Sequence, residues 1–420
     1  FGIVLFYGFS FLPYVINAKN APPDVSYLWT TEYPIDIYGN LSSINDGIHG
    51  SGIRISKITT GIPALNAPFI KFEYVGVGLV AGLFGFTDTL SIFYAYRTII
   101  SALAVIVVYL FVRQFFRSQW LIILGLFFCF FSAGITRLGA PKQVWDMMFG
   151  DGVVFGRLTT AMPHYLLGII GSLLFLMMFD RYWKTQKVSI WNVGAIGILT
   201  VVSTMINATS IVIPLLSTGI ITFFMVITKR FSVHKGMVWL FTTGVFFLLP
   251  SLYLMYVGKF WDFSMFAKTE KLWNIPFNPA LYVDAVGLVY ALSFLSIPGI
   301  WKRGRAGEWA MLLWLVLHPF MVFIGSELLS FNNVRMFYVP QYVIFSVLAT
   351  MGIADLFSFV KRYSKIGAYG LVGLAIGAVV WSSWGTYRLY YEKTRVSFES
   401  SRWPYPYGAP KKTVYDAILW

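Results

Sequence analysis

Cysteine is almost absent from this chain, which has one cysteine in 420 residues. That residue, Cys129, lies in an apolar stretch, so the sequence excludes an internal disulfide and carries no cysteine pattern for a metal site. Charged residues are also scarce, at 12% of the chain, with 18 Asp and Glu against 32 Lys and Arg. A chain with so few charges cannot cover the surface of a large soluble domain.

Long hydrophobic segments make up most of the chain, with 57% hydrophobic residues and a mean hydropathy of +0.69. A helix needs about 20 apolar residues to cross the hydrocarbon core, and only helices and closed barrels satisfy their backbone groups there. We therefore predict an all-α, polytopic transmembrane helical bundle of about 11 spans. We expect both ends of the chain to be trimmed. The predicted spans are residues 1–16, 90–112, 119–136, 159–179, 190–206, 210–228, 236–256, 280–300, 308–325, 335–358 and 366–386.

The formal net charge of +14 comes mainly from Lys/Arg clusters in short loops between predicted spans. This is the positive-inside pattern of membrane proteins, and it argues against a nucleic-acid surface. Only Asp180, Glu308 and Asp355 fall on the same, cytoplasmic side, so most acidic residues are expected outside, where the longer loops also lie. The five clusters are Arg113/Arg117, Arg181/Lys184/Lys187, Lys229/Arg230/Lys235, Lys302/Arg303/Arg305 and Lys361/Arg362/Lys365.

One apolar segment, residues 67–86, does not fit as a simple span. It follows a polar loop, residues 17–66, and is followed almost at once by the predicted span 90–112. If both segments crossed, every later basic cluster would lie on the wrong side of the membrane. We therefore predict that 67–86 lies at the outer surface, with the amino terminus inside and the carboxyl tail outside.

The first outer loop contains a predicted short helix over residues 34–47. Pro34 suits a first helical turn and Gly47 suits a stop. Apolar residues at spacings of four and three define one face, which would lie on lipid or protein: Ile37, Leu41 and Ile44. Asp36 and Asn40, four apart, share an adjoining face. Asp36 lies in the first turn, where the helix dipole favours its ionised form.

The pattern Asp36-x-x-x-Asn40-Leu41-Ser42 with Gly47 and Gly50 resembles the first outer loop of the GT-C superfamily of membrane glycosyltransferases. It is closest to a prokaryotic branch with an Asp-x-x-x-Tyr-Leu-Ser-like signature, related to protein O-mannosyltransferases and aminoarabinose transferases, although Asn40 replaces the Tyr. Segments further along the chain also match this layout: Pro68-Phe69 with the helix ending Leu83-Phe84-Gly85, Arg97, Pro163-His164, and Arg335 with Tyr338 and Pro340-Gln341.

The resemblance implies an inverting transfer of a sugar from a polyprenyl-phosphate donor to an extracytoplasmic glycan, lipid or protein acceptor. Phosphate is a good leaving group, so such an enzyme needs a base for the acceptor proton and a cation for the leaving phosphate. Asp36 is the first candidate for the base, and Glu32 is its rival, with Asp24 behind it. Arg335 is the candidate phosphate partner, because its planar guanidinium suits phosphate oxygens.

Each of these residues also has a plain structural interpretation. Asp36 would cap its helix, Arg335 would anchor a span at the interface, and His164 would be an interfacial structural residue. Arg97 lies inside a predicted span, where a charge is costly unless it is paired or functional; it would pair with a loop acid or bind phosphate. Further substrate-binding candidates are His164, Asn40, Tyr338 and Gln341, with His318 and Glu327 as weaker ones.

The cofactor prediction is open. No metal site is assigned, although Asp146 and Asp151 would be ligands if a divalent cation takes part. The expected domains are a transmembrane GT-C-like domain over 1–386, with the first outer loop and its juxtamembrane helices at 17–89, and the start of an extracytoplasmic tail at 387–420. The resemblance implies a multi-pass protein of a prokaryotic plasma membrane that takes part in glycan biosynthesis of the cell envelope. The alternatives are a transporter or flippase of lipid-linked glycans and a non-catalytic GT-C relative.

Overall fold

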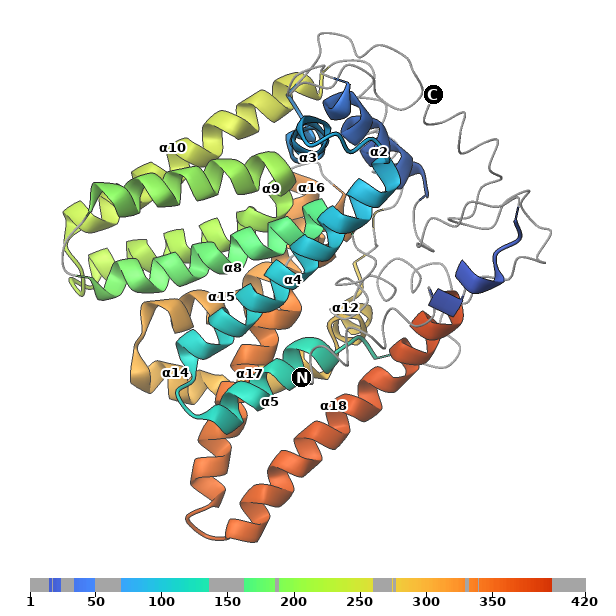
Figure 1. Ribbon diagram of the computed structural model, residues 1–420. Helices are drawn as coiled ribbons and strands as arrows, with labels where there is room; N and C mark the ends of the chain where they lie inside the picture. The colour runs from blue at the N-terminus through green and yellow to red at the C-terminus, as the bar shows by residue number, and fades with distance from the viewer. Residues whose placement is uncertain are drawn as a thin grey trace. The chain divides into compact units, whose positions relative to one another are not determined.

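The computed structural model contains residues 1–420 and describes residues 15–16, 18–23, 34–49, 69–135, 162–185, 189–259, 274, 277–328, 332–338 and 340–394. All regular elements in these ranges are helical (Figure 1). The helices bounded there are α2 Pro34–Ile48, α3 Phe72–Leu83, α4 Thr89–Phe115, α5 Gln119–Phe131, α8 Pro163–Lys184, α9 Ile190–Ile227, α10 Val233–Val257, α12 Pro279–Val286, α13 Leu288–Ser293, η1 Phe294–Ser296, α14 Ile297–Arg303, α15 Ala306–Phe320, η2 Met321–Gly325, α16 Ser326–Leu328, η3 Asn333–Tyr338, α17 Gln341–Val360 and α18 Lys365–Thr394.

Seven helices in the described residues are long and apolar enough to cross a membrane, or eight if a bent pair is one span. This confirms the predicted all-α polytopic bundle. Helix α3 has 12 residues, which gives a length of about 18 Å, so it cannot cross about 30 Å of hydrocarbon. The segment 67–86 therefore does not contain a spanning helix in its described part.

Helix α9 contains a sharp bend at Asn207, whose backbone angles are not helical (φ −154°, ψ 87°). Ser203 before the bend and Ser210 after it both meet one turn of α8. A Cβ on Gly171 would lie 2.2 Å from Ser203 Oγ, and Ser172 Oγ donates to the Ser210 carbonyl at 2.7 Å. In a straight helix, residues seven apart are about 10 Å apart along the axis. The two arms match the two predicted spans 190–206 and 210–228.

Two predicted spans, 280–300 and 119–136, do not form single straight helices, because they pack against each other at a helix break. Residues 280–300 form a pair bent by 92° at Gly287, whose φ of +82° suits only glycine and whose Cβ would lie 2.1 Å from the Ala133 carbonyl oxygen. In the predicted span 119–136, the described residues 119–135 form only the 13-residue α5, because 132–135 leave the helix to pack against this break. There, Ile135 N–H donates to the Asp284 carbonyl at 2.6 Å, so the irregular backbone is satisfied by protein.

The chain divides into two compact units. Unit 1 is Phe1–Ala102, Phe155–Leu166 and Arg388–Trp420, and unit 2 is Leu103–Val154 and Leu167–Tyr387. In unit 1, α2 packs closely on α3. The predicted apolar face of α2 faces protein, since Ile37, Leu41 and Ile44 are buried with Tyr74, Phe93 and Met162. Gly47 was predicted to stop the helix. Instead it lies inside α2, which ends at Ile48, and its missing side chain permits the contact with α3.

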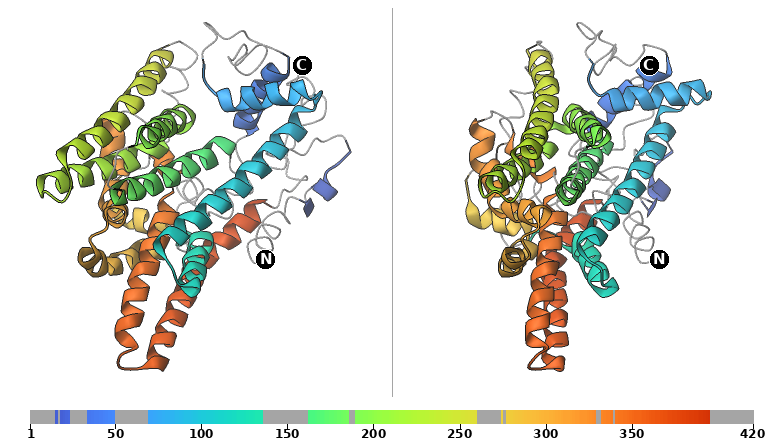
Figure 2. Two further views of the ribbon diagram at one scale, coloured as in Figure 1. Left: turned by 60° about the vertical axis from the view of Figure 1, so that its left-hand side comes forward. Right: turned by 90° about the vertical axis from the view of Figure 1, so that its left-hand side faces the viewer.

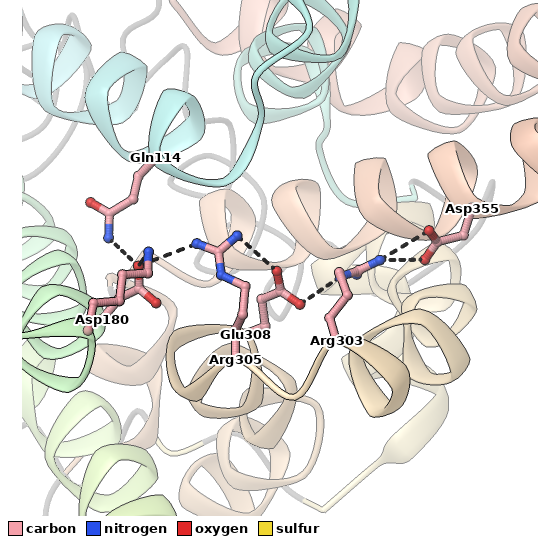
Figure 3. A network of polar contacts seen from close by, with 7 residues as sticks. Gln114, Asp180, Arg303, Arg305, Glu308 and Asp355 are labelled. Atoms are coloured by element: carbon pink, nitrogen blue, oxygen red, sulfur yellow. Dashed lines mark hydrogen bonds and ion pairs between the residues drawn. The ribbon is translucent and has the colours of Figure 1, made fainter.

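In unit 2, the three acids that were predicted to be cytoplasmic join basic residues in one network of polar contacts (Figure 3). Asp180 pairs with Lys184 and Arg305 and accepts from Gln114 at 2.9 Å. Glu308 pairs with Arg303 (2.8 Å) and Arg305 (3.2 Å), and Arg303 reaches Asp355 at 3.1 Å. The Lys235 ammonium donates to the Thr185 carbonyl, so the turn before α10 lies at the same end. Lys184, Arg303 and Arg305 therefore meet these acids at one end of this unit.

Helices α17 and α18 extend from unit 2 as a hairpin (Figure 2). The rings of Phe357 and Tyr369 pack edge to face across it, with centroids 5.6 Å apart. Further along, the hydroxyl of Ser383 accepts from Ala133 N–H at 2.9 Å, which ties α18 to the segment after α5. The predicted span 335–358 begins later than expected, because α17 starts at Gln341 and Arg335 lies in the separate 3-10 helix η3.

Candidate functional site

Helix α2 carries the predicted base. Asp36 lies in its first turn, as expected, but its side chain lies outside the described residues, and so do Glu32 and Asp24. One turn later, Asn40 is buried and its amide donates to Met162 Sδ at 3.4 Å. Asn40 therefore packs within unit 1, and its predicted contact with substrate stays a prediction.

His164, at the start of α8, is tied to the interfacial helix α3. Its Nδ1 lies 2.9 Å from the hydroxyl of Tyr74, a fully buried residue. The Tyr74 ring also packs edge to face on Tyr96 of α4, with centroids 5.9 Å apart. Burial, and next the nearby Glu73 carboxylate, hold the pKa of Tyr74 well above its usual value, so Tyr74 keeps its proton. The contact between His164 and Tyr74 thus joins α3 to the first turn of α8.

Arg97 on α4 is a buried cation, with 3% of its surface exposed. Its guanidinium carbon lies 5.0 Å from the centroid of the Tyr94 ring and 5.9 Å from that of Phe93. The ion pairs within the described ranges all involve Lys184, Arg303 or Arg305, so no described carboxylate neutralises Arg97. A charge in a span is costly without a partner, and the predicted role of Arg97 in binding phosphate stays a prediction.

Glu73, in the first turn of α3, is a titratable residue that sequence reasoning missed. Its side chain is half-buried, and its Oε2 is shielded from solvent without a hydrogen-bond partner among the described residues. Burial raises the pKa of Glu73 to about 7, against small opposing effects of its own backbone N–H and of Lys71. The acidic position at a helix start was visible in the sequence, but its burial depends on packing within unit 1.

Arg335 is half-buried in η3, and this short turn is held from several sides. Asn332 Oδ1 accepts from Val334 N–H at 2.9 Å, and Asn333 N–H donates to Asn274 Oδ1 at 3.1 Å. Gln341, a predicted substrate residue, is fully buried and its amide donates to the Phe337 carbonyl at 2.9 Å. Gln341 therefore supports the Arg335 turn, its amide oxygen is buried without a partner among the described residues, and its predicted contact with substrate stays a prediction.

The remaining candidates are less informative. Glu327 is exposed on α16, while the side chain of Tyr338 and residues Asp146 and Asp151 lie outside the described residues. Within the described ranges, no group of three or more His, Cys, Asp or Glu could hold a metal ion. Asp36, Asn40, Arg97 and His164 belong to unit 1, whereas Arg335 and Gln341 belong to unit 2.

Comparisons with known proteins give one clear result. No family model and no curated protein matches the sequence. Among solved structures, the chain is similar to the Archaeoglobus fulgidus oligosaccharyltransferase tethered to an acceptor peptide with the NVT sequon, with a TM-score of 0.58 and 15% identity over 99% of this chain. The apo form of that protein gives a TM-score of 0.56 at 14% identity, also over 99% of this chain.

The chain spans 56% and 57% of the length of these two structures. At this identity, the similarity establishes the fold and nothing of the reaction. The chain is an all-α polytopic protein whose fold is similar to that of the Archaeoglobus fulgidus oligosaccharyltransferase.

Proposed function

We propose that this protein is an inverting membrane glycosyltransferase of the GT-C type, which moves a sugar from a polyprenyl-phosphate donor to a glycan, lipid or protein acceptor. The observation that carries this proposal is Arg97, a buried cation with no acidic partner among the described residues. An anionic ligand would offset the cost of that charge, and the departing phosphate is the anion that the reaction forms.

The proposed roles follow from chemistry. Asp36, in the first turn of α2, takes the proton of the acceptor as the new glycosidic bond forms and the sugar–phosphate bond breaks. Arg97 and Arg335 are the proposed cations for the phosphate, and His164 holds α3 in place through Tyr74. Transfer takes place at the extracytoplasmic face of a prokaryotic plasma membrane in this proposal.

The experiment measures binding of a short-chain polyprenyl phosphate to the purified protein, with the matching polyprenol as the uncharged control ligand. Polyprenyl phosphate should bind and polyprenol should bind at least tenfold more weakly. Arg97→Gln should remove this preference, and Arg97→Lys should restore part of it. The matched control is Arg113→Gln, an exposed arginine at the other end of α4. Equal affinity of wild type for the two ligands would refute the proposal.

A second candidate, a transporter or flippase of lipid-linked glycans, is favoured by one observation. Transporters often place a broken helix at a binding site, and the pair Pro279–Val286 and Leu288–Arg303 is bent by 92°. Here, however, the break is packed against Ala133 and Ile135. Movement of a labelled lipid-linked glycan across reconstituted vesicles without transfer to any acceptor would favour this alternative. Phosphate binding with neither transfer nor movement would indicate the third candidate, a non-catalytic relative.

A further inference from the structure

His318 on α15 is fully buried in unit 2, where it makes two hydrogen bonds. Its Nε2 lies 2.9 Å from the Met336 carbonyl oxygen, and its Nδ1 lies 2.7 Å from the hydroxyl of Tyr282 on α12. A carbonyl oxygen can only accept, so Nε2 carries the hydrogen. In the neutral ring, Nδ1 is then the acceptor and Tyr282 the donor. The Met336 carbonyl thus fixes the tautomer, and Tyr282 completes it by donating to the other ring nitrogen.

The carbonyl that His318 holds belongs to the residue after Arg335. The next carbonyl, of Phe337, accepts from Gln341 at 2.9 Å. The Phe337 ring also meets the imidazole edge to face, with centroids 5.7 Å apart. Two consecutive carbonyls of η3 are therefore fixed by buried side chains of α15 and α17. A 3-10 turn has poor internal hydrogen-bond geometry, so such external bonds determine its position.

We propose that His318 is a positioning residue, which through its Nε2–H and the Met336 carbonyl holds the Arg335 turn where its guanidinium can bind the donor phosphate. This inference rests on the proposed function for the identity of the anion. The tautomer with hydrogen on Nε2, to which Tyr282 donates at Nδ1, is required for this role, because the other tautomer would point a lone pair at the Met336 carbonyl.

The test compares His318→Gln with His318→Asn. The Gln amide reaches the place of Nε2 and keeps a donor for Met336, whereas the shorter Asn amide does not. We expect His318→Asn to weaken binding of the short-chain polyprenyl phosphate at least tenfold, and His318→Gln to stay within about threefold of wild type. In an Arg335→Gln background, His318→Asn should add little, because the residue that it positions is already gone.

A second measurement does not depend on the ligand. Hydrogen exchange of the amides in 333–338 should be at least tenfold faster in His318→Asn than in wild type, and close to wild type in His318→Gln. Tyr282→Phe should show an intermediate increase. Equal loss of binding in both His318 variants, or effects of His318→Asn and Arg335→Gln that simply multiply, would overturn the inference. If wild type does not bind the phosphate, the proposed function fails, and unchanged exchange would separately refute the positioning role.

Discussion

A Cβ atom added to Gly47 on α2 would stand 3.0 Å from the carbonyl carbon of Gly78 on α3 and 2.1 Å from the Val75 carbonyl oxygen. The reverse addition to Gly78 would meet the Ile44 carbonyl oxygen at 2.0 Å. The backbones of these two helices are thus in direct contact. Because α2 carries Asp36, this crossing determines where the first turn of the predicted catalytic helix lies.

The first prediction concerns this crossing. Gly47→Ala or Gly78→Ala should lower the thermal unfolding midpoint, since overpacking typically costs about 1–3 kcal/mol. Gly76→Ala on the same helix is the control, because nothing lies within 4 Å of its added Cβ. Differential scanning fluorimetry in one detergent compares the three variants. If Gly76→Ala lowers the midpoint as much as the others, the close crossing is not what matters.

The second prediction concerns the proposed base. Asp36→Asn should lower the rate of sugar transfer by about 10²–10⁴, because the amide keeps the shape but cannot accept the proton. Binding of polyprenyl phosphate and the amount of folded protein should change little. The control is Glu32→Gln. Near-full turnover in Asp36→Asn together with loss in Glu32→Gln would transfer the role to Glu32.

The third prediction concerns pH and Glu73. Its folded-state pKa is raised from 4.5 to about 7, so between these values the folded state binds more protons than the unfolded state. The contribution of Glu73 to stability is therefore fully present below about pH 4.5 and is lost as the pH rises to about 7. Glu73→Gln should flatten this part of the stability profile. Thermal midpoints at several pH values, with exposed Asp88→Asn as the control, provide the measurement. An unchanged slope in Glu73→Gln would contradict the assignment.

The fourth prediction concerns the charge network of unit 2. Glu308→Gln should destabilise the protein by about 1–3 kcal/mol. This lies below the usual cost of breaking a fully buried pair, because the Arg303 and Arg305 side chains are 34% and 31% exposed. Asp355→Asn should cost less, since the Asp355 side chain is itself 41% exposed. The thermal unfolding midpoints of the two variants show which substitution destabilises the protein more. A larger loss in Asp355→Asn would show that the buried carboxylate is not the centre of the network.

The fifth prediction concerns topology. In a Cys129→Ser background, a cysteine replacing Asp88 should react with a membrane-impermeant maleimide applied from outside. A cysteine replacing Tyr363, which is 79% exposed in the turn between α17 and α18, should react only after the membrane is opened. Labelling at position 88 from the cytoplasm alone would show that 67–86 crosses the membrane.

Local sequence patterns were sufficient for the helices whose form depends on their own residues. Pro34 and the apolar spacing of Ile37, Leu41 and Ile44 predicted α2 to within one residue at its end, and Pro163 begins α8 as expected. The charge pattern also grouped Asp180, Glu308 and Asp355 on one side, and the structure joins them in one network. The hydropathy of a span and the charge of a loop are properties of a short segment, so the sequence alone predicts the helix and its side of the membrane.

Tertiary structure decided what depends on contact between distant segments. The sequence could not show that Gly47 serves a helix crossing, that Gly287 bends a span against Ala133, or that Glu73 is buried enough to titrate near neutrality. Nor could it show that the amide of Gln341, which we predicted to bind substrate, donates to the Phe337 carbonyl. Desolvation and backbone packing depend on which surfaces meet. Contacts between segments far apart in the sequence form only in the complete fold, so a local sequence pattern does not reveal them.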